Sequence, residues 1–273
     1  VKYRHNSTAT AVNWWERSVC AEYANRFCNV NASGVATNYI TATSYGLAPA
    51  FKVGSNPPPQ PISALAVGSS VYCNVSGVKT EFLIVHQGKP NDIYDDSCNG
   101  SWLLMKSCYD RHAWDSNNVN NYKTSLIPSY LNDTFLNLLD IRNVVRQVKI
   151  PYVNGTGGSP VASGADGLLS KVFLLSGREV GLGGLRYMPS DGSKLDYFDS
   201  ATATDSKRVA YLTDGTSIGW WTRSPYTDYT ITTWMVNTYG QGENPYTVNP
   251  GGVRPSFILP FDTQVDFQGN IVI

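Results

Sequence analysis

The residues that could carry acid–base, thiol or metal chemistry are few in this chain. They comprise three histidines (His5, His86 and His112) and five cysteines (Cys20, Cys28, Cys73, Cys98 and Cys108). The cysteine spacing matches no zinc pattern such as C-x-x-C, and no serine or cysteine lies in a nucleophile-elbow sequence. His86 ends an apolar stretch, which favours a structural histidine over a catalytic base. We therefore predict no catalytic residue, no metal site and no cofactor.

The cysteines and carboxylates leave weaker alternatives open. Cys20 with Cys28, and Cys98 with Cys108, are separated by short segments that could close as disulfides. The preferred interpretation is free, partly buried thiols. The segment NDIYDDSCNG carries an acidic pair that could hold calcium. It lacks the alternating ligands and the closing glutamate of an EF-hand loop, so we expect no calcium there.

The stronger chemical signal is a polar aromatic segment that runs from residue 226 to residue 249. Tyr and Trp alternate there with Thr, Asn, Asp, Gln and Glu, and neither Lys nor Arg occurs. Tyr and Trp supply large contact areas at a small entropic cost, and Asn supplies adaptable hydrogen bonds, as in antibody binding surfaces. The alternative is that these rings simply cover a β-rich surface. The predicted ligand-binding residues are Tyr226, Asp228, Tyr229, Thr232, Trp234, Tyr239, Glu243, Asn244 and Tyr246.

Two stiff stretches enclose this segment and must position it. WWTRSP precedes it and GGVRPSF follows it, and we call the two stretches together the frame. The frame is rich in residue types that fill a core or restrict the backbone. We predict that Trp220, Trp221, Arg223, Arg254 and Phe257 are mostly buried. Arg223 or Arg254 should then bind backbone carbonyls or a carboxylate, because an unpaired buried guanidinium is costly.

The frame occurs a second time near the N-terminus. Residues 14–51 align without a gap with residues 220–257 at a constant offset (220 − 14 = 206), and 13 of the 38 positions are identical. Such matching indicates an internal repeat, with fixed frame residues and changed residues between them. By correspondence, the first copy should carry a second and weaker binding face. Its predicted residues are Tyr23, Asn25, Arg26, Asn31, Asn38 and Tyr39.

The domain organisation follows from this repeat. Residues 1–53 form the N-terminal partial repeat, 54–61 (GSNPPPQP) a stiff Pro-rich linker that cannot join a sheet, 62–262 the main domain, and 263–273 a C-terminal tail strand. About 50 residues are too few to build a core like that of the main domain. We therefore expect the N-terminal copy to lack helices and strands of its own and to dock on the main domain or on a neighbouring subunit.

Short β-strands and one helix make up the expected main domain. A hairpin turning at Ser76–Gly77 leads into a strong strand over 82–86, and further strands are predicted over 102–109 and 171–176. Apolar residues at three-to-four spacing predict a helix within 125–151. The rest is rich in Gly, Asn and Ser. We expect an α+β fold with short twisted strands, one or two helices and much irregular loop.

Composition restricts the partners. Charged residues make up only 15% of the 273 residues, aromatic residues make up 12%, and the formal net charge is zero. Without a basic face, nucleic acid and anionic membrane are poor candidate partners. No apolar run approaches the roughly 20 residues that span a bilayer.

Several separated motifs carry a family resemblance. The frame and the preceding segments EFLIVHQGKP, SYLNDTFLNLL, KIPY and VFLLSGREVG resemble a domain-of-unknown-function family of bacterial and phage proteins, over about Gly68 to Pro260. The frame also looks like the end of a C-type-lectin-like fold, as in the variable proteins of diversity-generating retroelements. The N-terminal copy departs from the pattern, with Val19 in place of Pro225 and Ala48 in place of Arg254.

The resemblance implies a non-enzymatic display protein on a phage virion, in a tail or fibre, or on a cell surface. In such variable proteins the loops are hypervariable within a population, and here they would bind a host surface protein or a glycan. A first alternative is a structural virion or surface module whose loops pack against sister subunits in a trimer or another homo-oligomer. A second is an oxidase-type enzyme that uses Cys98 and Cys108 as a redox pair.

Overall fold

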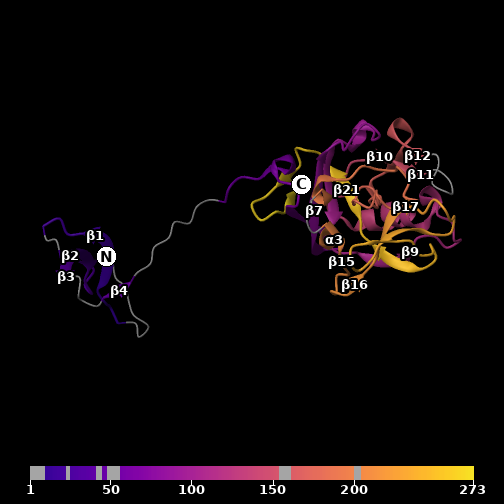
Figure 1. The fold of residues 1–273 in the computed structure, drawn as a ribbon. Coiled ribbons are helices and arrows are strands. Elements are labelled where there is room, and N and C mark those ends of the chain that lie inside the picture. Colours follow the sequence, from indigo (N-terminus) through magenta and orange to yellow (C-terminus); the bar gives the residue numbers. More distant parts are fainter. Residues whose placement is uncertain (1–9, 23–24, 41–44, 48–55, 154–160, 200–203) are drawn as a thin grey trace. The chain divides into compact units, whose positions relative to one another are not determined.

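The chain separates into two compact units. The computed structural model describes residues 10–22, 25–40, 45–47, 56–153, 161–199 and 204–273. Unit 1 comprises residues 1–56 and unit 2 residues 57–273, so the boundary lies inside the Pro-rich segment (Figure 1). Within the described ranges, no helix combines the length and the apolar character that crossing a membrane would require.

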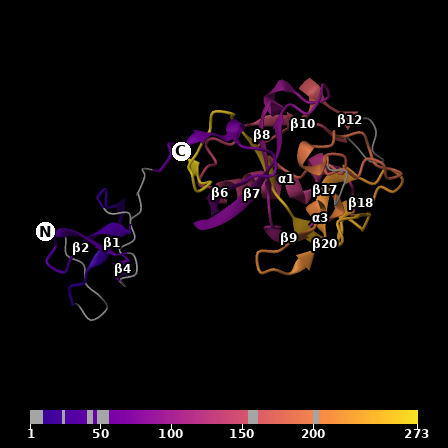
Figure 2. The ribbon, with the colours of Figure 1, turned by 60° about the vertical axis from the view of Figure 1, so that its left-hand side comes forward.

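The core of unit 2 contains a five-stranded sheet in the order β14-β21-β8-β7-β6. Its strands are β6 (Ser70–Val75), β7 (Val78–Gly88), β8 (Gly100–Met105), β14 (Val172–Phe173) and β21 (Ser256–Leu259). The predicted hairpin is confirmed, because Ser76 and Gly77 both have positive φ angles of 52° and 79° and join β6 to β7. Both ribbon views show the purple early strands of unit 2 close to its yellow C-terminal part (Figures 1 and 2).

A second five-stranded sheet carries the frame, in the order β19-β18-β17-β20-β9. Its strands are β9 (Asp110–Ala113), β17 (Trp220–Pro225), β18 (Thr233–Val236), β19 (Gly242–Glu243) and β20 (Pro250–Val253). β17 pairs antiparallel with β18 and parallel with β20. The two stretches of the frame therefore lie side by side, and the polar aromatic segment connects them.

Smaller pairings complete the strands of unit 2. β5 (Gln60–Pro61), β22 (Gln264–Val265) and β23 (Ile271–Val272) form a three-stranded sheet. The two-stranded ladders are β10 (Val148–Ile150) with β13 (Leu168–Ser170), β11 (Tyr152–Val153) with β12 (Val161–Ala162), and β15 (Ala210–Tyr211) with β16 (Ser217–Ile218). The expectation that the Pro-rich segment stays out of a sheet is wrong at Gln60–Pro61, where proline occupies an edge strand.

Helices are short throughout the described part of unit 2. They are α1 (Leu126–Ser129), the π-helix η4 (Tyr130–Phe135), α2 (Leu136–Leu138) and α3 (Thr204–Arg208). Single 3-10 turns are η1 (Ile62–Ala64), η2 (Asp96–Cys98), η3 (Tyr122–Thr124), η5 (Gly164–Asp166) and η6 (Asp196–Phe198). The fold is thus mostly β-sheet with a few short helices, which confirms the coarse α+β expectation.

The helix predicted within 125–151 ends at Leu138. Leu139 has an extended backbone with ψ 126° and forms a β-bridge with Val75. The carboxylate of Asp140 accepts hydrogen bonds from the backbone and side-chain amides of Asn74, at 3.1 and 2.8 Å. These contacts with the β6–β7 hairpin override the helical periodicity. The apolar residues that produced the periodicity are nevertheless buried, among them Leu139 and Ile141.

The described part of unit 1 forms a four-stranded sheet, so the expectation that it has no strands of its own is wrong. The strands are β1 (Trp14–Val19), β2 (Arg26–Val30), β3 (Ala36–Ile40) and β4 (Gly46–Leu47), in the order β3-β2-β1-β4. This order reproduces β19-β18-β17-β20. A sheet can form here without a large core because strand pairing is local, within hairpins of few residues.

The repeat extends to the pairing register. Trp14 pairs with Val30 and Val19 with Phe27, with an irregularity between Trp15 and Val19. In unit 2, Trp220 pairs with Val236 and Pro225 with Thr233, with an irregularity at the corresponding place. The parallel pairs Trp14–Gly46 and Trp220–Gly252 also correspond. Each pair in unit 2 is the pair of unit 1 displaced by the sequence offset.

The same turn follows the second strand of each copy. The side-chain oxygen of Asn31 accepts hydrogen bonds from the amides of Ser33 and Val35, each at 3.0 Å. The side-chain oxygen of Asn237 does the same for Tyr239 and Gln241, at 3.0 and 2.9 Å. The glycines at the left-handed position have φ angles of 79° (Gly34) and 80° (Gly240). The conserved spacing of Asn and Gly therefore encodes one turn twice.

Candidate functional site

The frame of unit 2 is fully buried, as the sequence predicts. Trp220, Trp221, Arg223 and Phe257 have no exposed surface, and Arg254 is 1% exposed. Trp221 donates from Nε1 to the carbonyl of His112 in β9 at 2.8 Å. These five buried side chains anchor both ends of the polar aromatic segment in the packed core of unit 2.

Arg223 makes the most extensive polar contacts in this base. Its Nη1 and Nη2 donate to the carboxylate of Glu179 at 2.6 and 2.5 Å, and its Nε donates to the carbonyl of Pro151 at 2.8 Å. Further bonds reach the carbonyls of Leu174 and Asp191. Desolvation lowers the pKa of Arg223, but Coulombic attraction to Glu179 and the hydrogen bonds that the Glu179 carboxylate accepts outweigh it, so the pKa is raised. Arg254 donates to the carbonyls of Met105 and Lys106. The predicted guanidinium partners are thus confirmed.

Asp191 is a second buried carboxyl group next to the Arg223–Glu179 ion pair. It is fully buried, and its carboxylate accepts hydrogen bonds from the hydroxyl of Ser224 at 2.9 and 2.7 Å. Desolvation raises its pKa to about 6, although Arg223 and the Ser224 bond act in the opposite direction. Glu179 and Asp191 both lie in the loop that carries Tyr187. The buried polar cluster therefore fixes the place where this loop meets β17.

Seven of the nine predicted ligand-binding residues retain accessible surface. Tyr229, Tyr239 and Tyr246 are 59%, 76% and 53% exposed. Asp228, Glu243 and Asn244 are exposed, and Tyr226 is half-buried. Thr232 and Trp234 are only 8% and 6% exposed, so the expectation of one exposed face is wrong for these two. The burial of Trp234 follows from its position in β18, because β18 is an interior strand of the sheet and all four of its residues are buried.

The buried ring of Trp234 is in contact with the more exposed tyrosines of the loop through Tyr226. Tyr226 contacts Trp234 with ring centroids 5.2 Å apart and stacks on Tyr229 at 6.1 Å with an interplanar angle of 13°. The ring of Tyr187 also contacts that of Tyr226, with centroids 5.2 Å apart, and the carbonyl of Tyr187 accepts a hydrogen bond from Trp234 Nε1 at 3.3 Å. The aromatic contacts thus run from the core to Tyr229 at the surface.

Asn120 fastens the loop between β17 and β18. Its side-chain amide donates to the carbonyls of Tyr226, Tyr229 and Thr232 at 3.0, 2.8 and 2.8 Å. Asn120 is fully buried and lies more than 100 positions earlier in the chain. Sequence reasoning missed Asn120 and Tyr187. A buried Asn carries no periodic signal of its own, and neither residue lies near the frame in sequence.

A pocket of about 370 Å³ opens beside these rings, and we call it the tyrosine pocket. Its two exposed tyrosines, Tyr229 and Tyr246, come from opposite ends of the polar aromatic segment. The β-bridge between Thr232 and Tyr246 brings these two ends together. The volume lies within the usual range of small-molecule sites. The hydroxyl of Thr232 is buried without a hydrogen-bond partner in the described part of the chain. The lining residues are Tyr229, Ile231, Thr232, Asn244, Pro245, Tyr246 and Asn249.

The structure brings four of the predicted residues into this pocket: Tyr229, Thr232, Asn244 and Tyr246. It adds Ile231, Pro245 and Asn249, which sequence reasoning did not single out. Tyr239 and Glu243 are exposed but do not line it. Asp228 is also outside the lining, although its charge contributes to raising the pKa of Tyr226, after desolvation. The predicted nine residues therefore form a pocket and its surroundings, not one uniform face.

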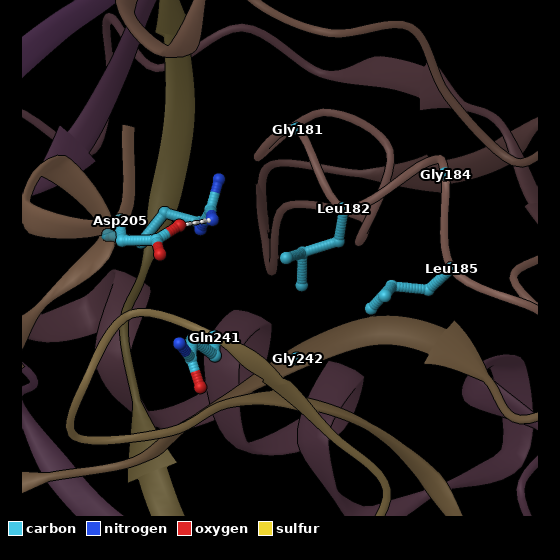
Figure 3. Close-up of a pocket in the computed structure, with 8 residues that line it drawn as sticks. Gly181, Leu182, Gly184, Leu185, Asp205, Gln241 and Gly242 are labelled. Atoms are coloured by element: carbon cyan, nitrogen blue, oxygen red, sulfur yellow. Dashed lines mark hydrogen bonds and ion pairs between the residues drawn. The ribbon is translucent and has the colours of Figure 1, made fainter. Parts of the chain in front are cut away.

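A second pocket of about 420 Å³ lies at the start of β19, and we call it the glycine pocket (Figure 3). Leu182 and Leu185 point toward it from one loop, and Gln241 and Gly242 form its other side. Arg208 is held there by its ion pair with Asp205 and by the carbonyl of Gly240. The pocket has few groups that could orient a ligand, because this guanidinium is already engaged.

The second binding face predicted on unit 1 is not a single face. Arg26 and Asn38 share one side of the sheet, where the guanidinium donates to the amide oxygen at 2.9 Å. Tyr39 follows Asn38 in β3 and therefore points to the opposite side. The side-chain oxygen of Asn31 is hydrogen-bonded within its own turn, and Asn25 is exposed. Tyr23 lies outside the described residues.

The thiols and histidines do not form a catalytic arrangement in the described residues. Cys20, Cys73, Cys98 and Cys108 are free thiols, as preferred from the sequence. Burial raises the pKa of Cys98 and of Cys108 to about 12, which disfavours the thiolates that redox chemistry uses. Nδ1 of His86 lies 2.8 Å from the carboxylate of Asp196. No group of three potential metal-ligating side chains occurs in the ranges that the structure covers.

Comparison with known proteins identifies one family. The model described as "Domain of unknown function (DUF6273)" matches residues 1–55 and 99–261, which contain both copies of the frame. No curated protein and no solved structure matches the chain.

Proposed function

Because this chain belongs to the DUF6273 family of domains of unknown function, we propose its function from its own site: it binds a ligand in the tyrosine pocket. We propose a non-enzymatic display protein on a phage virion or a cell surface, whose partner is a glycan or a protein of the host surface. The observation that carries the proposal is the pocket itself, in which Tyr229 and Tyr246 stand on a buried, rigid frame.

The chemistry of the lining favours a neutral, hydroxyl-rich ligand. The pocket offers two phenol rings and two Asn side chains, and none of its lining residues is charged. Sugar rings present apolar C–H faces that match aromatic rings and hydroxyl groups that match amides. A neutral glycan is therefore the ligand class that we favour. A C-type-lectin-like relationship and loops that vary within a population would agree with this proposal.

The arrangement also supports a role in display. Arg223 and Asn120, which fix the loop, are buried. Asn120 holds the loop by backbone carbonyls, including that of Tyr229, and not by the exposed side chains. Substitutions at the exposed positions would change the ligand without removing a frame contact. This separation between frame and loop is the property that a binding surface under selection requires.

Binding to a panel of neutral glycans and to host cells tests the proposal. Tyr229→Ala and Tyr246→Ala should each weaken binding by about 30-fold, the effect of a loss of about 2 kcal/mol at a hot-spot aromatic. Tyr211→Ala is the matched control, because Tyr211 is also about half exposed, at 49%, but lies on β15. Binding that is equal for all three variants would refute the site. Loss of self-association in place of ligand binding would favour a structural module.

A further inference from the structure

A pocket of about 440 Å³ lies along the loop that follows β14, and we call it the cationic pocket. Two of its lining residues, Arg178 and Lys194, carry a positive charge, and the others are one asparagine, one serine and four glycines. None of these lining residues is acidic. The pocket adjoins the glycine pocket, with which it shares Gly181 and Gly184, and it has no lining residue in common with the tyrosine pocket.

Arg178 is held in place at Nε and has two further donor groups that are not engaged. Its Nε donates to the carbonyl of Pro189 at 2.7 Å, and its side chain is half-buried. Within the described residues, neither Nη1 nor Nη2 makes a hydrogen bond or an ion pair, and neither atom is buried. The planar guanidinium matches two oxygens of one anion. Because the Nε bond already restricts this side chain, little further freedom is lost when an anion binds to it.

The other unengaged polar groups of the lining are mostly donors. The side-chain oxygen of Asn91 accepts a hydrogen bond from the amide of Ile93 at 3.1 Å, so the NH2 group of Asn91 is the end that remains for a ligand. The backbone amides of Gly183 and Gly184 donate to no acceptor in the part of the chain that the structure describes. A lining rich in donors favours a ligand group that presents oxygens.

Lys194 supplies a second positive charge that a ligand can reach. Its ammonium lies 2.5 Å from the carboxylate of Asp199, and the two side chains are 49% and 65% exposed. Exposed ion pairs of this kind are weak, so an anionic ligand can replace Asp199 at low cost. Glu179, which follows Arg178 in the sequence, is already paired with Arg223 in the core. The buried carboxylate therefore does not neutralise the pocket.

Two of the glycines in the lining are not required by the fold. Neither Gly183 nor Gly184 has a positive φ angle. An added Cβ would be in ordinary contact with the Arg178 side chain, at 3.5 Å, in the case of Gly183, and would meet no atom within 4 Å in the case of Gly184. At Gly192, by contrast, a Cβ would lie 2.3 Å from Ser176 Oγ. The missing side chains of Gly183 and Gly184 leave their backbone amides open to close approach by a ligand.

We propose that the cationic pocket binds the carboxylate, sulfate or phosphate group of a ligand. The two Nη groups of Arg178 bind two of its oxygens, and the ammonium of Lys194 balances its charge. The amides of Gly183 and Gly184 donate to its oxygens, as backbone amides do in other anion sites. This site is additional to the tyrosine pocket, whose uncharged lining favours a neutral ligand.

Titration of the isotope-labelled chain with sulfate, phosphate and glucuronate, followed by NMR, tests the proposal. The amide signals of Gly183 and Gly184 should shift with at least one of these anions and should saturate at millimolar concentrations, as expected for a ligand of few atoms. Glucose, and sodium chloride at the same ionic strength, are the controls and should not produce these shifts. Preference for glucuronate would identify a carboxylate site, and preference for sulfate or phosphate a site for a tetrahedral group. The absence of a saturable shift with all three anions would overturn the proposal.

Substitution of Arg178 tests whether the bound anion occupies this pocket. Arg178→Gln should weaken anion binding by about tenfold or more, because hydrogen bonds from a charged donor are lost. Arg186→Gln is the matched control, since Arg186 is an exposed arginine of the same loop that does not line the pocket. It should leave the affinity unchanged. Equal affinities of the two variants would contradict the assignment of the site.

Gly184→Glu keeps the proposal testable if loss of the Pro189 bond prevents Arg178→Gln from folding. A side chain at Gly184 has open space, so this variant should melt at the temperature of the wild type. Its carboxylate adds a negative charge to the lining and should weaken anion binding by about tenfold or more. A folded variant that binds anions as tightly as the wild type would overturn the proposal. Tyr229→Ala should bind anions normally, so this site can fail while the proposed function of the tyrosine pocket holds.

Discussion

Arg223 and Glu179 are joined at two points in the centre of unit 2, at 2.6 and 2.5 Å, and neither side chain has any exposed surface. The pair connects strand β17 to the loop that also contains Asp191 and Tyr187. The carbonyl of Tyr187 accepts bonds from Thr227 and Trp234, which belong to the polar aromatic segment and to β18. A buried ion pair thus holds the loop whose Tyr187 carbonyl is hydrogen-bonded to the polar aromatic segment.

Glu179→Gln should destabilise unit 2 by about 3–5 kcal/mol, because it leaves the Arg223 charge buried and uncompensated. Urea unfolding measures this change. The matched control is Lys106→Ala, which breaks the surface pair with Glu81, where the lysine is 56% exposed. The control should cost less than about 1 kcal/mol. Equal costs for the two variants would mean that the buried pair does not fix the frame.

The stability of Asp191→Asn relative to the wild type should depend on pH. An aspartate titrates near 3.9 in an unfolded chain, whereas desolvation raises the pKa of buried Asp191 to about 6. The folded state therefore binds this proton more tightly. The resulting stability is present below about pH 4 and is lost as the pH rises through about 6.

Because one pKa unit corresponds to 1.36 kcal/mol, wild-type unit 2 should lose about 2 kcal/mol relative to Asp191→Asn between pH 4 and pH 7. Urea unfolding of both proteins at several pH values measures the difference. The substitution keeps an oxygen that can accept the Ser224 hydrogen bond. A difference that is constant over this range would show that Asp191 titrates alike in the folded and unfolded chains.

Sequence reasoning predicted the frame because its information is local. Trp, Arg, Pro and Gly at fixed spacing require burial and particular backbone angles, and the second copy of the motif confirmed which positions matter. The Asn31 and Asn237 turns were not predicted, although the repeat contains Asn and Gly at the same spacing in both copies. The predictions that failed concern residues whose conformation depends on partners distant in sequence. The helix ends at Leu138 because Asp140 is hydrogen-bonded to Asn74 of the β6–β7 hairpin. The loop between β17 and β18 is fixed by Asn120, which no local pattern connects to Tyr229.

The candidate site was predicted by composition more than by geometry. Composition identified the segment but not which side of each strand faces solvent, so Trp234 was placed on the surface and Asn249 was missed. The error in unit 1 has a related origin. Counting residues excluded a core but did not exclude a sheet, because hairpin strands can pair without one.

Trp234→Ala should mainly affect the fold. Its ring is 6% exposed and contacts Tyr226, so truncation should cost about 3–5 kcal/mol, in the range of buried aromatic residues. Tyr229→Ala should cost less than about 1 kcal/mol, because Tyr229 is 59% exposed. Thermal melting of both variants gives the comparison. Similar losses of stability in the two variants would mean that Tyr229 is also part of the core. Tyr229 could then not serve as an exposed ligand-binding residue of the pocket.

Thr232→Val separates binding from stability most sharply. The threonine hydroxyl is buried at the tyrosine pocket without a partner in the described structure, and such a group is costly to leave unsatisfied. Valine has nearly the same shape, so the variant should be as stable as the wild type or more stable by about 1 kcal/mol. If a ligand hydroxyl or a bridging water satisfies Thr232 in the complex, binding should weaken by about fivefold or more. Melting and ligand titration on the same preparation measure both effects. A variant that is stabilised and binds normally would show that the ligand does not reach Thr232, and the pocket would then act only through its two tyrosines.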